Sequence, residues 1–169
     1  MGVGCYRLPL RLQEEWLGLR GAREWVAGLR LSGDVLEWFG LRFGAEGSVE
    51  FISLEGVAGA VGTVHYHPYE HSLLPIPSMS DGLAWVYLSY HEIPDDLNPI
   101  FFIVFRDGYA GWVMFPKPPV VRRVWREEYL RVREEDTASW RLCLRLLDEG
   151  MMKAGVLRLG QSEAEFQTF

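Results

Sequence analysis

Two apolar segments on either side of Asp107-Gly108 constrain the fold of this chain more than any other feature. The segments are residues 100–105 (IFFIVF) and 109–115 (YAGWVMF), and an Asp-Gly pair between two such runs is a strong hairpin signal. The longest purely apolar run, Ile100 to Phe105, has only six residues, far fewer than the roughly 20 that a membrane-spanning helix needs. The sequence therefore predicts a β-hairpin and no membrane-spanning segment.

The rest of the chain mixes helical and strand patterns without a regular β-α-β alternation. Helical spacing of apolar residues predicts helices over residues 11–20, from Asp81 onward, and over 137–153. Further strands are predicted over residues 24–31, 35–43, 49–54, 61–67 and 120–129. The polar tail after Gly160 is expected to fray. We therefore predict an α+β class: a single domain with a central mixed β-sheet flanked by helices, plus a C-terminal helical extension.

Composition excludes several classes of function. The net charge is −6 with no basic stripe, so neither nucleic acid nor an anionic membrane surface is expected as a partner. The only cysteines, Cys5 and Cys143, form no Cys-x-x-Cys motif and so no thiolate zinc or redox site. The first twenty residues include Pro9 and several charges, unlike a signal peptide. A cytoplasmic protein is the resulting expectation.

Clustered histidines are the strongest chemical signal. His65 and His67 alternate on a predicted strand, so both side chains point to the same face of the sheet. Pro68 ends the strand at once and places the pair beside a loop. Asp81 follows fourteen residues after His67, at the start of a predicted helix. Two histidines and one carboxylate are the ligand count of a catalytic zinc site, which keeps a coordination position open.

Simpler interpretations exist for each part of this cluster. A lone histidine is usually a surface or core residue, and Ser78-x-x-Asp81 also reads as a helix-capping box. A cupin-like metalloenzyme would instead use His65, His67 and Glu70 to bind iron or manganese, with His91 as a later ligand. That set leaves Ser78-x-x-Asp81 unexplained.

The combination resembles the signature of the JAMM (MPN-type) zinc metallopeptidases. The matching stretches are residues 62–68 (GTVHYHP) and 77–81 (PSMSD), which read as His-x-His-Pro, a loop, and Ser-x-x-Asp. The resemblance implies that His65, His67 and Asp81 bind one Zn²⁺ per chain. It also implies that Ser78 stabilises the oxyanion of the reaction.

The family further requires a catalytic glutamate upstream, at the head of a strand after the first helix. Glu24 holds that setting, 41 residues before His65. Glu37, Glu50 and Glu55 are its competitors. The chain departs from the family pattern in a slightly longer loop after Pro68.

The resemblance implies a fold and an activity. The expected fold is the cytidine-deaminase-like JAMM/MPN fold of a prokaryotic or archaeal-type member, with residues 1–135 as catalytic domain and 136–169 as a C-terminal helix and tail. The expected activity is hydrolysis of an amide or isopeptide bond after the C-terminal glycine of a ubiquitin-like protein, which would be the partner. The oligomeric state is left open, with a homodimer as one possibility. A non-catalytic MPN-fold scaffold is the competing reading.

Overall fold

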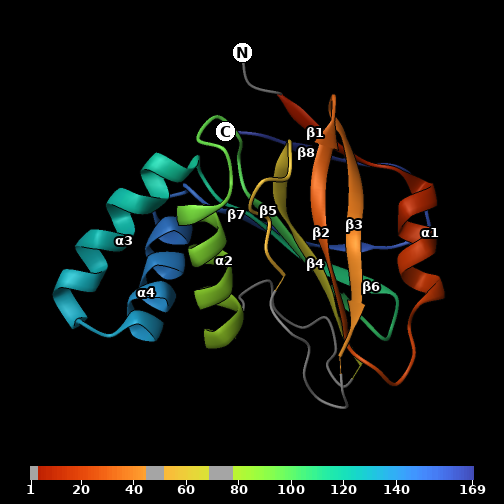
Figure 1. The fold of residues 1–169 in the computed structure, drawn as a ribbon, viewed down its shortest axis with the longest axis horizontal. Helices are drawn as coiled ribbons and strands as arrows, with labels where there is room; N and C mark the ends of the chain where they lie inside the picture. The colour runs from red at the N-terminus through yellow and green to blue at the C-terminus, as the bar shows by residue number, and fades with distance from the viewer. Residues whose placement is uncertain (1–3, 45–51, 69–77) are drawn as a thin grey trace.

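The predicted hairpin is present in the computed structural model as two strands of a larger mixed sheet (Figure 1). Strand β5 (Ile100–Phe105) pairs antiparallel with β6 (Tyr109–Met114). Between them, Gly108 has a φ of 89°, in the left-handed region that favours glycine. The structure describes residues 4–44, 52–68 and 78–169.

In these residues eight strands form one curled sheet in the order β7-β6-β5-β4-β2-β3-β1-β8. The β4–β5 and β1–β3 pairs are parallel, and every other neighbouring pair is antiparallel. The six remaining strands are β1 (Cys5–Leu8), β2 (Trp25–Ser32), β3 (Val35–Phe43), β4 (Ala60–His67), β7 (Lys153–Arg158) and β8 (Ala164–Gln167). The mixed sheet confirms the predicted α+β class.

Four helices in the described part of the chain cover both faces of the sheet. Helix α1 (Leu10–Gly18) packs on one face, and α2 (Met79–His91), α3 (Pro118–Val132) and α4 (Glu135–Asp148) pack on the other (Figure 1). Each face therefore has its own hydrophobic core. Trp16 of α1 contacts Phe102 in the first core, with ring centroids 5.4 Å apart, and Trp85 of α2 stacks on Phe101 in the second.

Strand β4 is buried between these two cores. Val64 and Tyr66 belong to the core on the α1 side. Because side chains alternate along a strand, His65 and His67 project to the opposite face, where α2 packs. The β4–α2–β5 connection joins two parallel strands, so it brings the beginning of α2 over the carboxyl end of β4.

The predicted strand over residues 120–129 is wrong, because this segment lies within helix α3. Two prolines occupy the first positions of the helix, where a missing N–H costs nothing. The buried residues Val121, Val124 and Glu128 then follow at helical spacing. The β-branched valines resembled a strand pattern, but their period is that of a helix.

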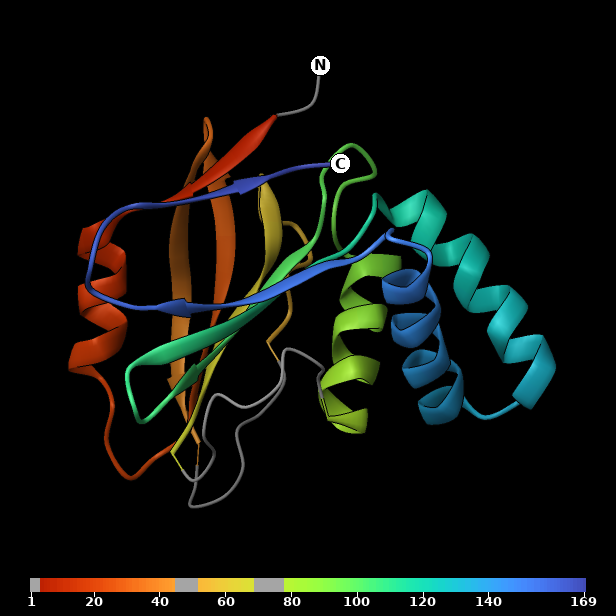
Figure 2. The same cartoon turned by 180° about the vertical axis from the view of Figure 1, so that it is seen from behind.

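The predicted frayed tail is also wrong. Strand β8 pairs with β1, and Phe166 packs edge-on against both Phe102 and Trp112. Strand β7 pairs with β6 at the other edge of the sheet, so the chain runs from one edge to the other after α4 (Figure 2). The expected C-terminal helix is present as α4 but ends at Asp148, and the residues after it complete the sheet.

Two other predictions have a simple outcome. Residues 49–51 of the predicted strand 49–54 lie outside the described residues, and residues 52–54 are not in a strand. No helix among the described residues is long and apolar enough to span a bilayer.

Candidate metal centre

The three predicted ligands converge from one strand and one helix. His65 and His67 are the sixth and eighth residues of β4, and Asp81 lies in the first turn of α2. Their ligand atoms all lie within 4.8 Å of one another. This is the one such cluster of histidine, cysteine and acidic side chains found in the described residues. The group could hold a metal ion, as the sequence predicted.

The separation of two ligand atoms in the group matches that of a tetrahedral zinc site. Nε2 of His65 lies 3.4 Å from Oδ1 of Asp81, and the rings of His65 and His67 have centroids 4.6 Å apart. Zinc binds nitrogen and oxygen at about 2.0–2.1 Å, so two ligands of one tetrahedral zinc lie about 3.3–3.4 Å apart. His65 and Asp81 already have that separation.

Two buried polar atoms of the group have no hydrogen-bond partner among the described residues. They are Nε2 of His65 and Oδ2 of Asp81. The whole of His65 is only 7% exposed. A buried polar atom without a partner costs about 1–3 kcal/mol, so such atoms call for an unseen partner. A metal ion bound by both residues would be that partner, and the donor set of two imidazoles and one carboxylate fits zinc.

The surroundings of Asp81 keep it ionised, as a metal ligand must be. Burial raises the pKa of this carboxyl group, but the polar contact with His65, the charge on the histidines and the hydroxyl of Ser78 outweigh burial and lower the pKa to about 2. The first turn of a helix also favours a negative charge, because the macrodipole is positive there.

Trp85 packs beside His65, a contact that the sequence alone did not indicate. Its ring stacks on Phe101 at 5.2 Å and an interplanar angle of 11°, and it lies 6.3 Å from the ring of His65. It follows Asp81 by one helical turn on the same face of α2. The i, i+4 spacing of Asp81 and Trp85 is the sequence feature from which this contact could have been predicted.

Ser78 is the N-cap of α2. Its Oγ accepts a hydrogen bond of 3.3 Å from the backbone N–H of Asp81, so the capping interpretation of Ser78-x-x-Asp81 is correct. The hydroxyl is exposed and adjoins the metal-binding group through Asp81. Capping uses the oxygen as an acceptor, so the hydroxyl proton can still be donated, for example to Oγ of Ser80 at 3.2 Å.

Glu24 immediately precedes β2. In the β2–β4 ladder Trp25 pairs with Tyr66 and Val26 with His65, so one more step of this register sets Glu24 opposite His67. Its carbonyl accepts a hydrogen bond from the backbone N–H of Gly44, which continues the β2–β3 ladder to this residue. Alternation along the strand places Glu24 on the face that carries both histidines.

The carboxylate of Glu24 is half-buried and makes no hydrogen bond or ion pair with any described residue. Its competitors are placed differently. Glu37 forms an ion pair with Arg30, which lies near the far end of the β2–β4 ladder from His65. The backbone N–H of Glu55 bonds to the side chain of Glu92, in a turn outside the sheet. Glu50 lies outside the described residues.

The cupin-like set is not assembled in the described residues. Glu70 lies outside them, as does His71. His91 is ten residues beyond Asp81 on the same helix, about 15 Å along the helix axis. It packs instead between Tyr87 and Tyr90, with centroids 4.7 and 4.6 Å away. The geometry therefore favours Asp81 as the third ligand.

The chain matches no protein-family model, no curated protein and no solved structure.

Proposed function

We propose that this protein is a zinc-dependent metallopeptidase of the JAMM type, acting on amide or isopeptide bonds. The convergence of His65, His67 and Asp81, with two buried polar atoms that have no hydrogen-bond partner among the described residues, carries the proposal. Three protein ligands are characteristic of catalytic zinc, whereas structural zinc sites almost always have four. Zinc is the proposed ion because residues 62–68 and 77–81 resemble the JAMM signature, since two histidines and one carboxylate alone also suit iron(II).

The residues around the group supply the remaining parts of a hydrolytic site. Zinc, when bound, would contribute Lewis-acid polarisation and ready deprotonation of water near neutral pH. Glu24, beside His67 in the strand register, would take a proton from the attacking water and deliver it to the leaving amine. The Ser78 hydroxyl would donate to the developing oxyanion, a contribution of about 2.7–4 kcal/mol for one such donor elsewhere.

The proposed substrate is the C-terminal glycine of a ubiquitin-like protein, joined to an amine. Glycine has no side chain, so it permits close approach of the peptide backbone to a buried group. His65 is almost fully buried, and α2 lies over it. This substrate class rests on the resemblance of the motif, and the cytidine-deaminase-like family fold is proposed on the same basis.

The test combines metal analysis with a cleavage assay. The full chain is loaded with zinc, and cleavage of ubiquitin-like fusions and lysine conjugates is compared for wild type, Glu24→Gln and Glu37→Gln. We expect one zinc per chain in all three proteins. Activity should fall by at least about 100-fold in Glu24→Gln, since general acid–base catalysis contributes roughly 10²–10⁴-fold, and should stay near wild type in Glu37→Gln.

Two results would contradict the proposal. If wild type binds zinc but cleaves none of these substrates, the non-catalytic scaffold is the better reading. If Glu24→Gln cleaves as fast as wild type, Glu24 is not the proton carrier.

A further inference from the structure

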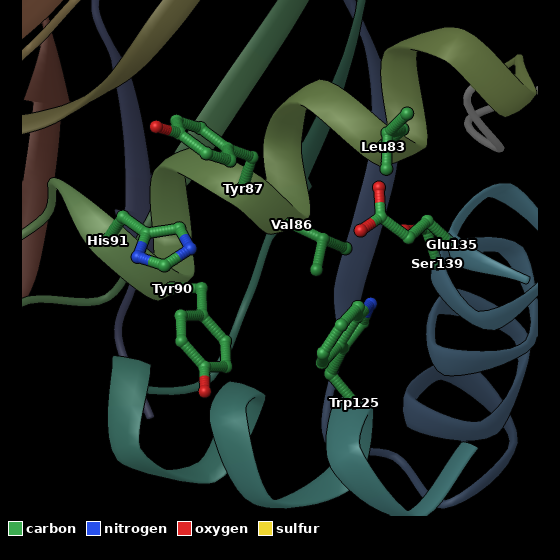
Figure 3. Close-up of a pocket in the computed structure, with 8 residues that line it drawn as sticks. All are labelled: Leu83, Val86, Tyr87, Tyr90, His91, Trp125, Glu135 and Ser139. Atoms are coloured by element: carbon green, nitrogen blue, oxygen red, sulfur yellow. The ribbon is translucent and has the colours of Figure 1, made fainter. Parts of the chain in front are cut away.

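A pocket lies between the three helices that cover one face of the sheet (Figure 3). It has a volume of about 200 Å³ and is lined by one stripe of α2, by Trp125 of α3 and by the first turns of α4. Small-molecule sites usually measure roughly 300–1,000 Å³. This pocket is smaller, so it suits a single side chain better than a nucleotide or another large cofactor.

The pocket is separate from the metal centre. At about 100° per residue, Val86 and Tyr90 lie about 140° and 180° around α2 from Asp81. One side of the helix therefore serves the metal-binding group, and the opposite side forms the wall of the pocket. A ligand in this pocket would contact α2 without approaching His65 or His67.

Two polar atoms at the pocket are buried without a hydrogen-bond partner among the described residues. They are Oγ of Ser139, whose side chain is 0% exposed, and Nε1 of Trp125. In Figure 3 the indole nitrogen lies on the edge of the ring that points toward Glu135 and Ser139. A helix can normally satisfy a serine through its own backbone. Both atoms nevertheless lack hydrogen-bond partners within the described part of the chain, and a bound ligand would supply them.

The carboxylate of Glu135 completes the polar end of the pocket. It points into the space between α2 and Trp125 (Figure 3), and it forms no hydrogen bond or ion pair with the described residues. The polar end thus offers a donor in Trp125, an acceptor in Glu135, and in Ser139 a hydroxyl that can do either. The rest of the lining consists of the apolar Leu83 and Val86 and of the aromatic rings of Tyr87, Tyr90 and His91, which also carry polar atoms.

We propose that this pocket binds the side chain of a tyrosine from a partner protein. A phenol has an apolar ring for the walls and a hydroxyl that both donates and accepts. It can donate to Glu135 while it accepts from Trp125 or Ser139. The half-exposed Tyr87 lies at the rim and adds an aromatic surface against which a second ring packs.

Other side chains match the pocket less well. A lysine or arginine could pair with Glu135 but cannot accept from Trp125 N–H. The guanidinium groups of Arg122 and Arg126 also lie 5.8 and 5.7 Å from the ring of Tyr90, so positive charge is already present at the opposite end. A carboxamide has the right polar groups but would leave the aromatic walls poorly covered.

Glu135 also has an ordinary role that needs a control. It lies in the first turn of α4, where an acidic residue is favourable whatever its other contacts. Asp136 shares that turn and that charge, but it does not line the pocket. The variant Asp136→Ala therefore reproduces the helix-end effect of Glu135→Ala without touching the polar end of the pocket.

The experiment follows the indole N–H signal of Trp125 by ¹H–¹⁵N NMR in the full chain, with the signal assigned by its loss in Trp125→Phe. The probes are N-acetyl-tyrosinamide and N-acetyl-phenylalaninamide, which differ by one hydroxyl. We expect a saturable shift with the tyrosine probe. The phenylalanine probe should bind at least about fivefold more weakly than the tyrosine probe, which is the effect of losing one hydrogen bond. Glu135→Ala and Ser139→Ala should each lower the affinity for the tyrosine probe by a similar factor, and Asp136→Ala should leave that affinity unchanged.

Several results would overturn the proposal. Equal binding of the two probes would mean that the hydroxyl is not recognised and that any apolar side chain suffices. Equal weakening by Asp136→Ala and Glu135→Ala would assign the effect to the helix end. If p-cresol shifts the Trp125 signal and N-acetyl-tyrosinamide does not, the pocket excludes a polypeptide. The absence of any saturable shift would remove the site altogether.

Discussion

Zinc should stabilise the fold, and the size of the effect can be worked out from how the ligands are placed. His67 ends β4 and Asp81 begins α2, so the ligand group exists only when the strand and the helix are packed together. A ligand that binds only the folded state at 100 times its Kd adds about 2.7 kcal/mol to the free energy of unfolding. For a chain of this length each kcal/mol raises Tm by about 2–4 °C, so the expected rise is about 5–11 °C.

The assay is thermal unfolding of metal-free protein, followed by circular dichroism, with zinc added from zero to 100 times the measured Kd. The same titration is made with His67→Ala, which leaves two protein ligands. The control is His91→Ala, because His91 packs between tyrosines at the far end of α2. We expect the full rise in Tm in wild type and His91→Ala, and a rise of no more than about 2 °C in His67→Ala at the same zinc concentrations.

A zinc-dependent rise that is equal in His67→Ala and wild type would refute the reasoning, since the ion would then be bound elsewhere. A wild-type Tm that does not respond to zinc would refute it as well. A response lost in His91→Ala and kept in His67→Ala would place the ion near the tyrosines instead.

Three further predictions test the surrounding structure. Gly62→Ala should abolish soluble folded protein, because the added Cβ would lie 1.6 Å from a backbone carbonyl oxygen of β5. The control is Gly18→Ala, whose added Cβ would have no atom within 4 Å. Soluble expression and circular dichroism compare the two variants. Glu128→Gln should lower the free energy of unfolding, measured by urea titration, by about 1–3 kcal/mol. Removing one partner of a fully buried ion pair costs about 3–5 kcal/mol. The loss is smaller here because the side chains of the three arginine partners are 32–61% exposed and can be solvated by water. Burial raises the pKa of Cys143 to about 12 from its ordinary value near 9, so iodoacetamide at pH 8 should alkylate only Cys5 in the native chain, as counted by mass spectrometry. The raised pKa of Cys143 also means that its contribution to stability is complete below about pH 9 and is lost as pH rises toward 12.

Local patterns were enough to predict those elements whose interactions are themselves local. The β5–β6 hairpin was visible because its turn and both strands are adjacent in the chain. Helix α3 was equally local, but its valines were read as β-branched strand residues, although their i, i+3 spacing is helical. Strands β7 and β8 gave no comparable signal. β8 has four residues and pairs with β1, more than 150 positions earlier in the chain, so long-range pairing rather than its own sequence makes it a strand.

The candidate site likewise has parts that local sequence predicts and parts that depend on long-range packing. Alternation in β4 and the capping of α2 are local, so the sequence predicted that His65 and His67 share a face and that Asp81 begins a helix, whereas packing of α2 on the sheet brings the three together. The choice of Glu24 over the other glutamates depends on the register between β2 and β4, which is set by packing between segments some forty residues apart. A shift of that register by one residue would turn Glu24 to the opposite face from His67. The position of the proposed base is therefore a consequence of tertiary structure, and for this reason the comparison of Glu24→Gln with Glu37→Gln tests the structure as directly as it tests the chemistry.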